Sequence, residues 1–202
     1  MRDVCQGNNA LHYGKSKDVL QSSSGIVRGA AKFNLRSSEL HVPTLNGYEW
    51  ASSLTISIWF KKSGGISSNI ISNFINNQSD STGSWGILVS NNGGTMDTIR
   101  ATLVTSQSRK SWDNITMPFI DHWHHFVMTY DGYTVSFYHN NRLALIDSLC
   151  CRGNIVSSNS DVVIGGRIYG QDLHAGYTDE VKILKRSVDR YEVTKLYQLR
   201  TL

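Results

Sequence analysis

Three histidines, His122, His124 and His125, surround one tryptophan and form a cluster of metal-ligating side chains. Imidazole is a preferred zinc ligand, and a zinc site collects three or four such ligands around one ion. The neighbouring residues favour a β-strand, in which alternate side chains point to opposite faces. His122 and His124 therefore share one face and His125 lies on the other. Zinc would need ligands from elsewhere that the sequence does not mark, so we interpret the segment as an ordinary strand.

The carboxylates are not spaced for hydrolysis of a sugar chain. Glycoside hydrolysis needs two carboxyl groups about 5–10 Å apart, which on one strand means acids two residues apart. The only adjacent acids, Asp179 and Glu180, point to opposite faces of a strand. There is no Gly-x-Ser-x-Gly turn, and Cys150-Cys151 has no marked histidine partner. We therefore predict that the protein is not an enzyme. A polysaccharide-active enzyme stays an alternative if acids from separate strands converge.

Aromatic side chains in loops can stack on sugar rings, while nearby amides and carboxylates supply directed hydrogen bonds. The candidate ligand-binding residues chosen on this basis are Trp50, Trp85, Asn92, Trp112, Asp113 and Tyr169. The alternative is that these aromatic residues fill the core, where large rings contribute most of the buried area.

Two tripeptides, beginning at Asn77 and Asn114, match the acceptor pattern for N-linked glycosylation. They are candidate glycosylation sites if the chain follows a secretory route. Three cysteines, Cys5, Cys150 and Cys151, are too few and too unevenly placed for a disulfide framework. One bridge from Cys5 to either member of the pair and three reduced thiols both remain open.

Short strand-like runs separated by turn residues predict an all-β sandwich or barrel. The runs are residues 54–60, 85–90, 99–105, 124–130, 135–138, 143–147, 162–164 and 181–184. In the first run Leu54, Ile56, Ile58 and Phe60 share one face, which we expect to enter the core, whereas Trp59 lies on the other. Trp59 indicates that this strand is covered on both faces.

Turn and helix signals complete the pattern. Asn140-Asn141 tolerates positive φ and predicts a tight hairpin. Asp189 followed by Glu192 resembles a capping box ahead of helically spaced apolar residues, so one short C-terminal helix is expected. Residues 63–80 are rich in serine and asparagine, and we expect a long loop there.

Size and charge limit the remaining classes. A chain of 202 residues is expected to form one domain over 1–202. The net charge of +4 is scattered, which argues against a nucleic-acid partner. No run of about 18 apolar residues exists, so no membrane insertion is expected. Residues 1–7 lack an apolar signal segment. We expect either that a signal was removed or that the protein reaches its site by another route, such as assembly into a virus particle.

Five segments in order resemble the laminin-G-like, concanavalin A-like lectin jelly-roll family, which is related to the pentraxins, over residues 10–198. They begin at Gly29 (GAAKFN, then LHVP), Leu54 (LTISIWFK), Trp123 (WHHFVMTYDG), Val135 (VSFY) and Gly176 (GYTDEVKILKR). The resemblance implies an antiparallel, two-sheet jelly-roll sandwich. Departures from the family pattern occur at Asn34, Asn141 and Thr178.

The resemblance also implies a candidate calcium site. Family members often hold a structural calcium between an early loop and the strand that carries an Asp-Glu pair. The matching residues here are Asp179 and, in the loop of residues 14–24, Asp18. Calcium prefers six to eight oxygen ligands. The alternative is that Asp179 accepts backbone hydrogen bonds that hold the terminal strand.

Together these features predict a non-catalytic recognition or adhesion module. It would bind glycan or a protein partner through loops or a sheet face, outside the cell or on the surface of a particle. A second hypothesis is a structural assembly subunit, such as a virus coat or fibre protein or a component of an extracellular filament, that packs against copies of itself or other subunits.

Overall fold

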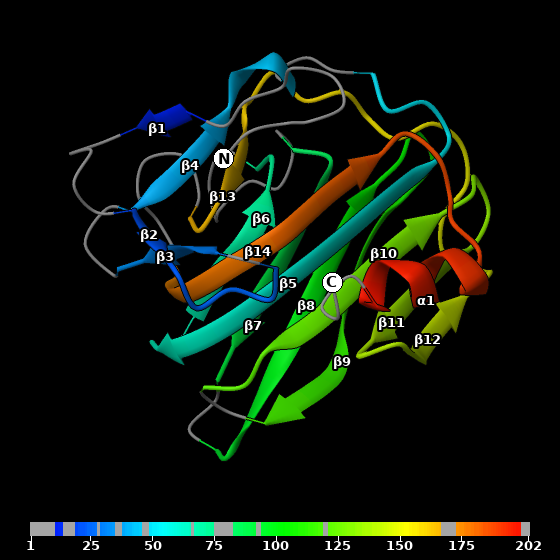
Figure 1. Ribbon diagram of the computed structural model, residues 1–202. Coiled ribbons are helices and arrows are strands. Elements are labelled where there is room, and N and C mark those ends of the chain that lie inside the picture. Colours follow the sequence, from blue (N-terminus) through cyan, green and yellow to red (C-terminus); the bar gives the residue numbers. More distant parts are fainter. Residues whose placement is uncertain are drawn as a thin grey trace.

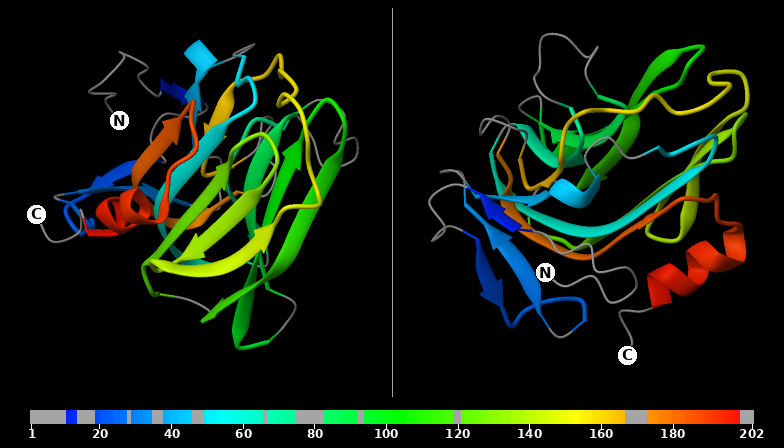
Figure 2. Two further views of the ribbon diagram at one scale, coloured as in Figure 1. Left: turned by 90° about the vertical axis from the view of Figure 1, so that its right-hand side faces the viewer. Right: turned by 90° about the horizontal axis from the view of Figure 1, so that it is seen from above.

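The protein forms two antiparallel sheets that face each other, with one helix on the outside (Figures 1 and 2). The computed structural model describes residues 11–13, 19–27, 29–34, 38–45, 49–65, 67–74, 83–91, 94–118, 121–166 and 173–198. This arrangement confirms the predicted two-sheet sandwich with a short C-terminal helix.

Each sheet contains seven strands. The first sheet has the order β1 (Leu11–Tyr13), β4 (Glu39–Val42), β13 (Val162–Ile164), β6 (Ser67–Ser72), β7 (Trp85–Ser90), β8 (Met96–Val104) and β9 (Arg109–Pro118). The second sheet has the order β12 (Arg142–Asp147), β11 (Val135–His139), β10 (His124–Tyr130), β5 (Leu54–Gly64), β14 (Ala175–Leu184), β3 (Ala30–Phe33) and β2 (Leu20–Ser22). A 3-10 turn (Pro43–Leu45) follows β4, and the helix α1 spans Arg190–Gln198.

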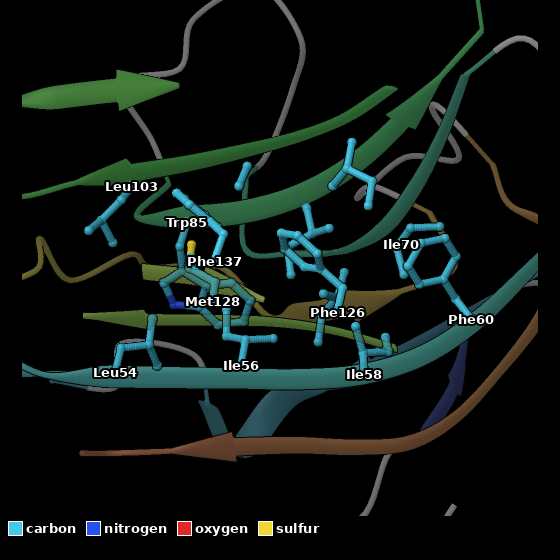
Figure 3. Packing of buried hydrophobic residues seen from close by; sticks show 14 of the residues in the cluster. Leu54, Ile56, Ile58, Phe60, Ile70, Trp85, Leu103, Phe126, Met128 and Phe137 are labelled. Atoms are coloured by element: carbon cyan, nitrogen blue, oxygen red, sulfur yellow. The ribbon is translucent and has the colours of Figure 1, made fainter. Parts of the chain in front are cut away.

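The core fills the space between the two sheets (Figure 3). Strand β5 contributes Leu54, Ile56, Ile58 and Phe60, all fully buried, as the alternation in the sequence predicts. They point toward side chains of the opposite sheet such as Trp85 (Figure 3). Because burial of one large apolar side chain contributes roughly 1.5–3 kcal/mol, this layer holds the sheets together.

The outer face of the second sheet is partly covered by α1, which lies in front of β10 and β11 in Figure 1. Val193 of the helix packs against Val127 of β10 and Tyr138 of β11 in a small second cluster. Near the end of the helix, Tyr197 stacks on Trp59 of β5 with ring centroids 5.3 Å apart. Trp59 is thereby buried, which confirms that β5 is covered on both faces.

Local signals determine where these elements begin and turn. The backbone amide of Glu192 donates to Asp189 Oδ1 at 2.8 Å, and the amide of Asp189 donates to Glu192 Oε2 at 3.4 Å. This is the predicted capping box, and the helix starts directly after it. Asn140 and Asn141 have φ values of 49° and 62° and form the predicted hairpin between β11 and β12.

Four strands of the first sheet, β1, β4, β6 and β9, were not among the predicted runs, and two of them show why. Strand β6 lies inside residues 63–80, so the expectation of one long loop there is wrong for that part. Its asparagine and serine residues are buried rather than solvated; Asn69, for example, donates to Ser72 Oγ at 2.9 Å. Strand β9 is mostly polar because its residues alternate between the core and solvent.

Candidate ligand-binding face

Four side chains lie in one line across the open part of the second sheet's outer face. The strand register pairs Lys32 of β3 with Tyr177 of β14, and Tyr177 with Lys61 of β5. Trp123 directly precedes β10, and the pairing of His124 with Phe60 places it beside Lys61. We call Lys32, Tyr177, Lys61 and Trp123 the basic aromatic row. All four side chains are partly exposed.

Cations and rings are interleaved in the basic aromatic row. The Nζ atoms of Lys32 and Lys61 lie 5.7 and 4.7 Å from the centroid of the Tyr177 ring. The Trp123 and Tyr177 rings are 6.3 Å apart between centroids, at an interplanar angle of 53°. These distances permit cation–π attraction between each ammonium group and the Tyr177 ring.

Helix α1 marks one boundary of the basic aromatic row. On β5 the outer-face position before Lys61 is Trp59, which Tyr197 covers. Beyond Lys32, the register places Leu20 of edge strand β2, and its side chain is 49% exposed. The open surface therefore runs from Trp123 to Leu20, with apolar groups at both ends and ammonium groups between them.

Three predicted ligand-binding residues are core residues instead. Trp50, Trp85 and Trp112 are 2%, 0% and 5% exposed. The Trp50 and Trp85 rings meet edge to face, with centroids 5.5 Å apart. Trp112 packs on Phe137, and its Nε1 donates a hydrogen bond to Asp147 Oδ2. The prediction that they stack on a ligand is wrong, because a sugar ring could reach them only by opening the space between the sheets.

The other predicted site residues are scattered. Asp113 is exposed on β9 and pairs with Arg100 at 3.0 Å, in the sheet opposite the basic aromatic row. Asn114, in the second glycosylation tripeptide, is also exposed. The residues Asn92, Tyr169, Asp18, Asn77 and Cys5 lie outside the described part of the chain. Cys150 and Cys151 are free thiols, not bridged to each other.

Asp179 forms a backbone clamp between the early chain and β14. Its Oδ2 atom accepts hydrogen bonds from the amides of Ile26 and Val27 at 2.7 and 3.0 Å, and Oδ1 accepts from the amide of Glu180 at 2.9 Å. Burial raises the pKa of the Asp179 carboxyl, and these amide bonds oppose the increase. The contacts match the alternative that Asp179 holds the terminal strand. Calcium at Asp179 and Asp18 stays a prediction.

His124 and His125 lie on opposite faces of β10, as the strand alternation predicts. His125 lies on the outer face under Tyr197, with Nε2 2.9 Å from Ser57 Oγ. His124 lies between the sheets, with Nδ1 2.9 Å from Nε2 of His139. Burial lowers the pKa of His124 to about 4 and that of His125 to about 3, so both rings are neutral at pH 7. Among the described residues, no group of three or more histidine, cysteine or acidic side chains could hold a metal ion.

Solved structures similar to this chain share its fold. The binding domain of botulinum neurotoxin serotype G superposes with a TM-score of 0.67 at 20% identity, covering 98% of this chain and 48% of the toxin domain. This chain thus spans about half the length of that domain. Domain 4 of an extracellular arabinanase from Geobacillus stearothermophilus, in complex with arabinotriose, gives a TM-score of 0.63 at 16% identity and coverages of 95% and 82%.

A third similar structure is the heptameric pentraxin of Limulus polyphemus, with a TM-score of 0.55 at 16% identity and coverages of 73% and 70%. No curated protein matches the sequence. Among the described residues, no helix has the length and apolar character needed to cross a membrane. The family model of the concanavalin A-like lectin/glucanases superfamily matches residues 36–194. The chain therefore belongs to this superfamily, as the ordered sequence motifs predicted.

Proposed function

We propose that the protein is a non-catalytic recognition module that binds a carbohydrate on the basic aromatic row. The observation that carries this proposal is the line of Trp123, Lys61, Tyr177 and Lys32 across adjacent strands, on a sheet face that α1 leaves open. Tyrosine and tryptophan provide flat apolar surfaces, and lysine provides hydrogen-bond donors around them. A sugar chain lying across the strands would contact both rings.

The fold comparison supports a binding role. The similar arabinanase domain was solved with arabinotriose, and the similar toxin domain is named a binding domain. The acids nearest the basic aromatic row also favour binding over hydrolysis. Asp179 is engaged by three backbone amides, and Glu180 pairs with Lys182. Hydrolysis of a glycosidic bond would require two carboxyl groups directed at the ligand.

A glycan array tests the proposal directly. The wild-type protein should bind a defined set of glycans, and Trp123→Ala and Tyr177→Ala should each weaken the best hit by about tenfold or more, the effect of losing roughly 1–2 kcal/mol of ring contact. Tyr133→Ala is the matched control, because Tyr133 is 66% exposed in the turn between β10 and β11. Binding unchanged in both row variants, or no binding by the wild type, would contradict the proposal.

The same proposal places the protein outside the cell or on the surface of a particle. Exposure of Asn114 supports glycosylation in a secretory route. Mass spectrometry of the protein produced in secreting eukaryotic cells would detect a glycan on Asn114, and Thr116→Ala should remove it.

Self-assembly is a second candidate function, favoured by the edge strand β12. Leu143 and Ile146 are 50% and 61% exposed there. If β12 pairs antiparallel with β12 of a second copy so that Leu143 faces Ile146, apolar side chains match across the interface. Light scattering should then show a dimer that Ile146→Lys dissociates; a monomer at high protein concentration would refute assembly.

A further inference from the structure

Among the described residues, no carboxylate forms an ion pair with either ammonium group of the basic aromatic row. Lys32 and Lys61 each contact the Tyr177 ring. Both Nζ atoms lie within 6 Å of the same ring centroid, so a ligand stacked there meets two positive charges together.

The two acidic side chains that follow Tyr177 on β14 are engaged by other groups. Asp179 is buried and engaged by backbone amides, and Glu180 pairs with Lys182. Asp121, two residues before Trp123, is exposed, and its backbone amide donates to the carbonyl oxygen of Lys62 at 2.8 Å. Of the exposed acidic residues that the structure describes, Asp121 lies nearest in sequence to Trp123, and we expect its carboxylate to oppose an anion bound there.

We infer that the carbohydrate is acidic, with carboxylate or sulfate groups on its sugar rings. This inference rests on the proposed function and specifies its ligand class. The aromatic rings of Trp123 and Tyr177 would contact the apolar faces of sugar units. Lys32 and Lys61 would form charge-assisted hydrogen bonds with acid groups on either side of Tyr177. Lysine acts as a point charge without a fixed planar geometry, which suits acid groups that vary in position along a flexible chain.

A matched pair of ligands isolates the effect of charge. Oligogalacturonate and its fully methyl-esterified form have the same sugar rings, but only the former carries carboxylates. Titration calorimetry should show at least about tenfold tighter binding of the free acid, and the preference should shrink between about 50 and 300 mM NaCl, because both lysines are partly exposed and salt screens such charges. The same titration with a heparin hexasaccharide shows whether sulfate groups are bound in place of carboxylates.

Charge variants connect the preference to the basic aromatic row. The double variant Lys32→Gln, Lys61→Gln should lose the preference for the free acid and keep weak binding of the ester. The charge-matched control Arg142→Gln, Arg152→Gln removes two exposed cations outside the row and should behave as wild type. Asp121→Asn should strengthen binding of the free acid several-fold, because a repulsive carboxylate is removed.

Each outcome decides the inference. Equal binding of the free acid and the ester by the wild type overturns the acidic class and leaves the proposed carbohydrate function standing. The inference is also overturned if Trp123→Ala and Tyr177→Ala lose binding to every glycan while the double variant Lys32→Gln, Lys61→Gln keeps the wild-type preference for the free acid. Tighter binding of a thymidine hexanucleotide than of any glycan overturns both proposals, because bases and phosphates would then be the groups recognised.

Discussion

Lys62 and Asp97 form a buried ion pair that joins the two sheets, with Nζ 3.0 Å from Oδ1 and side chains that are 1% and 0% exposed. Lys62 follows Phe60 on the core face of β5, and Asp97 precedes Ile99 on the core face of β8. Charges removed from water depend on each other, because the interior cannot solvate either one alone.

Removal of one member of this ion pair should therefore destabilise the protein strongly. We expect Lys62→Met or Asp97→Leu to lower the free energy of unfolding by about 3–5 kcal/mol, because each removes the oppositely charged partner of a buried charge. The double variant should recover most of that loss. Urea unfolding followed by tryptophan fluorescence measures all three proteins, and additive losses in the double variant would refute the coupling.

Three buried histidines whose pKa is lowered, His124, His125 and His174, predict a loss of stability in acid that exceeds the opposite effect of His41, whose pKa is raised beside Glu39 and Asp161. Burial lowers the folded-state pKa of His124 to about 4, of His125 to about 3 and of His174 to about 4, against about 6.5 in an unfolded chain. Below pH 6.5 the unfolded chain therefore binds protons that the folded protein does not. The free energy of unfolding should be largest above pH 6.5 and fall as the pH drops toward 4.

Urea unfolding between pH 8 and about pH 4 measures this dependence. His125→Gln should flatten the curve, because it removes one of the groups whose pKa burial lowers. A curve with the same slope in His125→Gln would show that other groups cause the acid sensitivity.

Asp179 supplies the third prediction. Asp179→Ala leaves the amides of Ile26, Val27 and Glu180 without their acceptor, and it should lower the free energy of unfolding by about 2–3 kcal/mol. Asp179→Asn keeps one oxygen and should lose less. Thermal unfolding scans measure these losses. The same scans with added calcium chloride test the calcium prediction, because a bound ion raises Tm with ligand concentration and Asp179→Asn would abolish that increase.

The capping box predicts a smaller effect. Asp189→Ala removes the acceptor for the Glu192 amide and should cost about 1 kcal/mol. Asp189→Ser should restore most of it, because serine also caps helices. The rescue distinguishes capping from a general effect of charge, and thermal unfolding by circular dichroism measures both variants.

Much of the fold was predictable because its signals are local. The alternation from Leu54 to Phe60, the Asn140-Asn141 turn and the Asp189–Glu192 cap each act within a few residues, and the structure confirms all three. Strand β6 escaped prediction because its polar side chains are buried, so its composition suggests a loop although tertiary hydrogen bonds stabilise a strand.

The candidate site was not predictable in the same way. Trp123 and Tyr177 lie inside the family motifs and are absent from the predicted ligand contacts, which include Trp50 and Trp85 instead. The structure shows the opposite arrangement, because Trp50 and Trp85 are buried whereas Trp123 and Tyr177 are partly exposed. The basic aromatic row exists only because the strand register aligns residues far apart in sequence, and a single sequence does not reveal which strands are neighbours.

The clamp between Ile26 and Asp179 joins residues that are 153 positions apart, and β5 likewise pairs with strands made much later, β10 and β14. During synthesis, the apolar face of β5 therefore leaves the ribosome long before its neighbours exist. The second sheet can close only after β14 has emerged, so folding should be slow, with an interval in which an exposed apolar strand depends on chaperones to avoid aggregation.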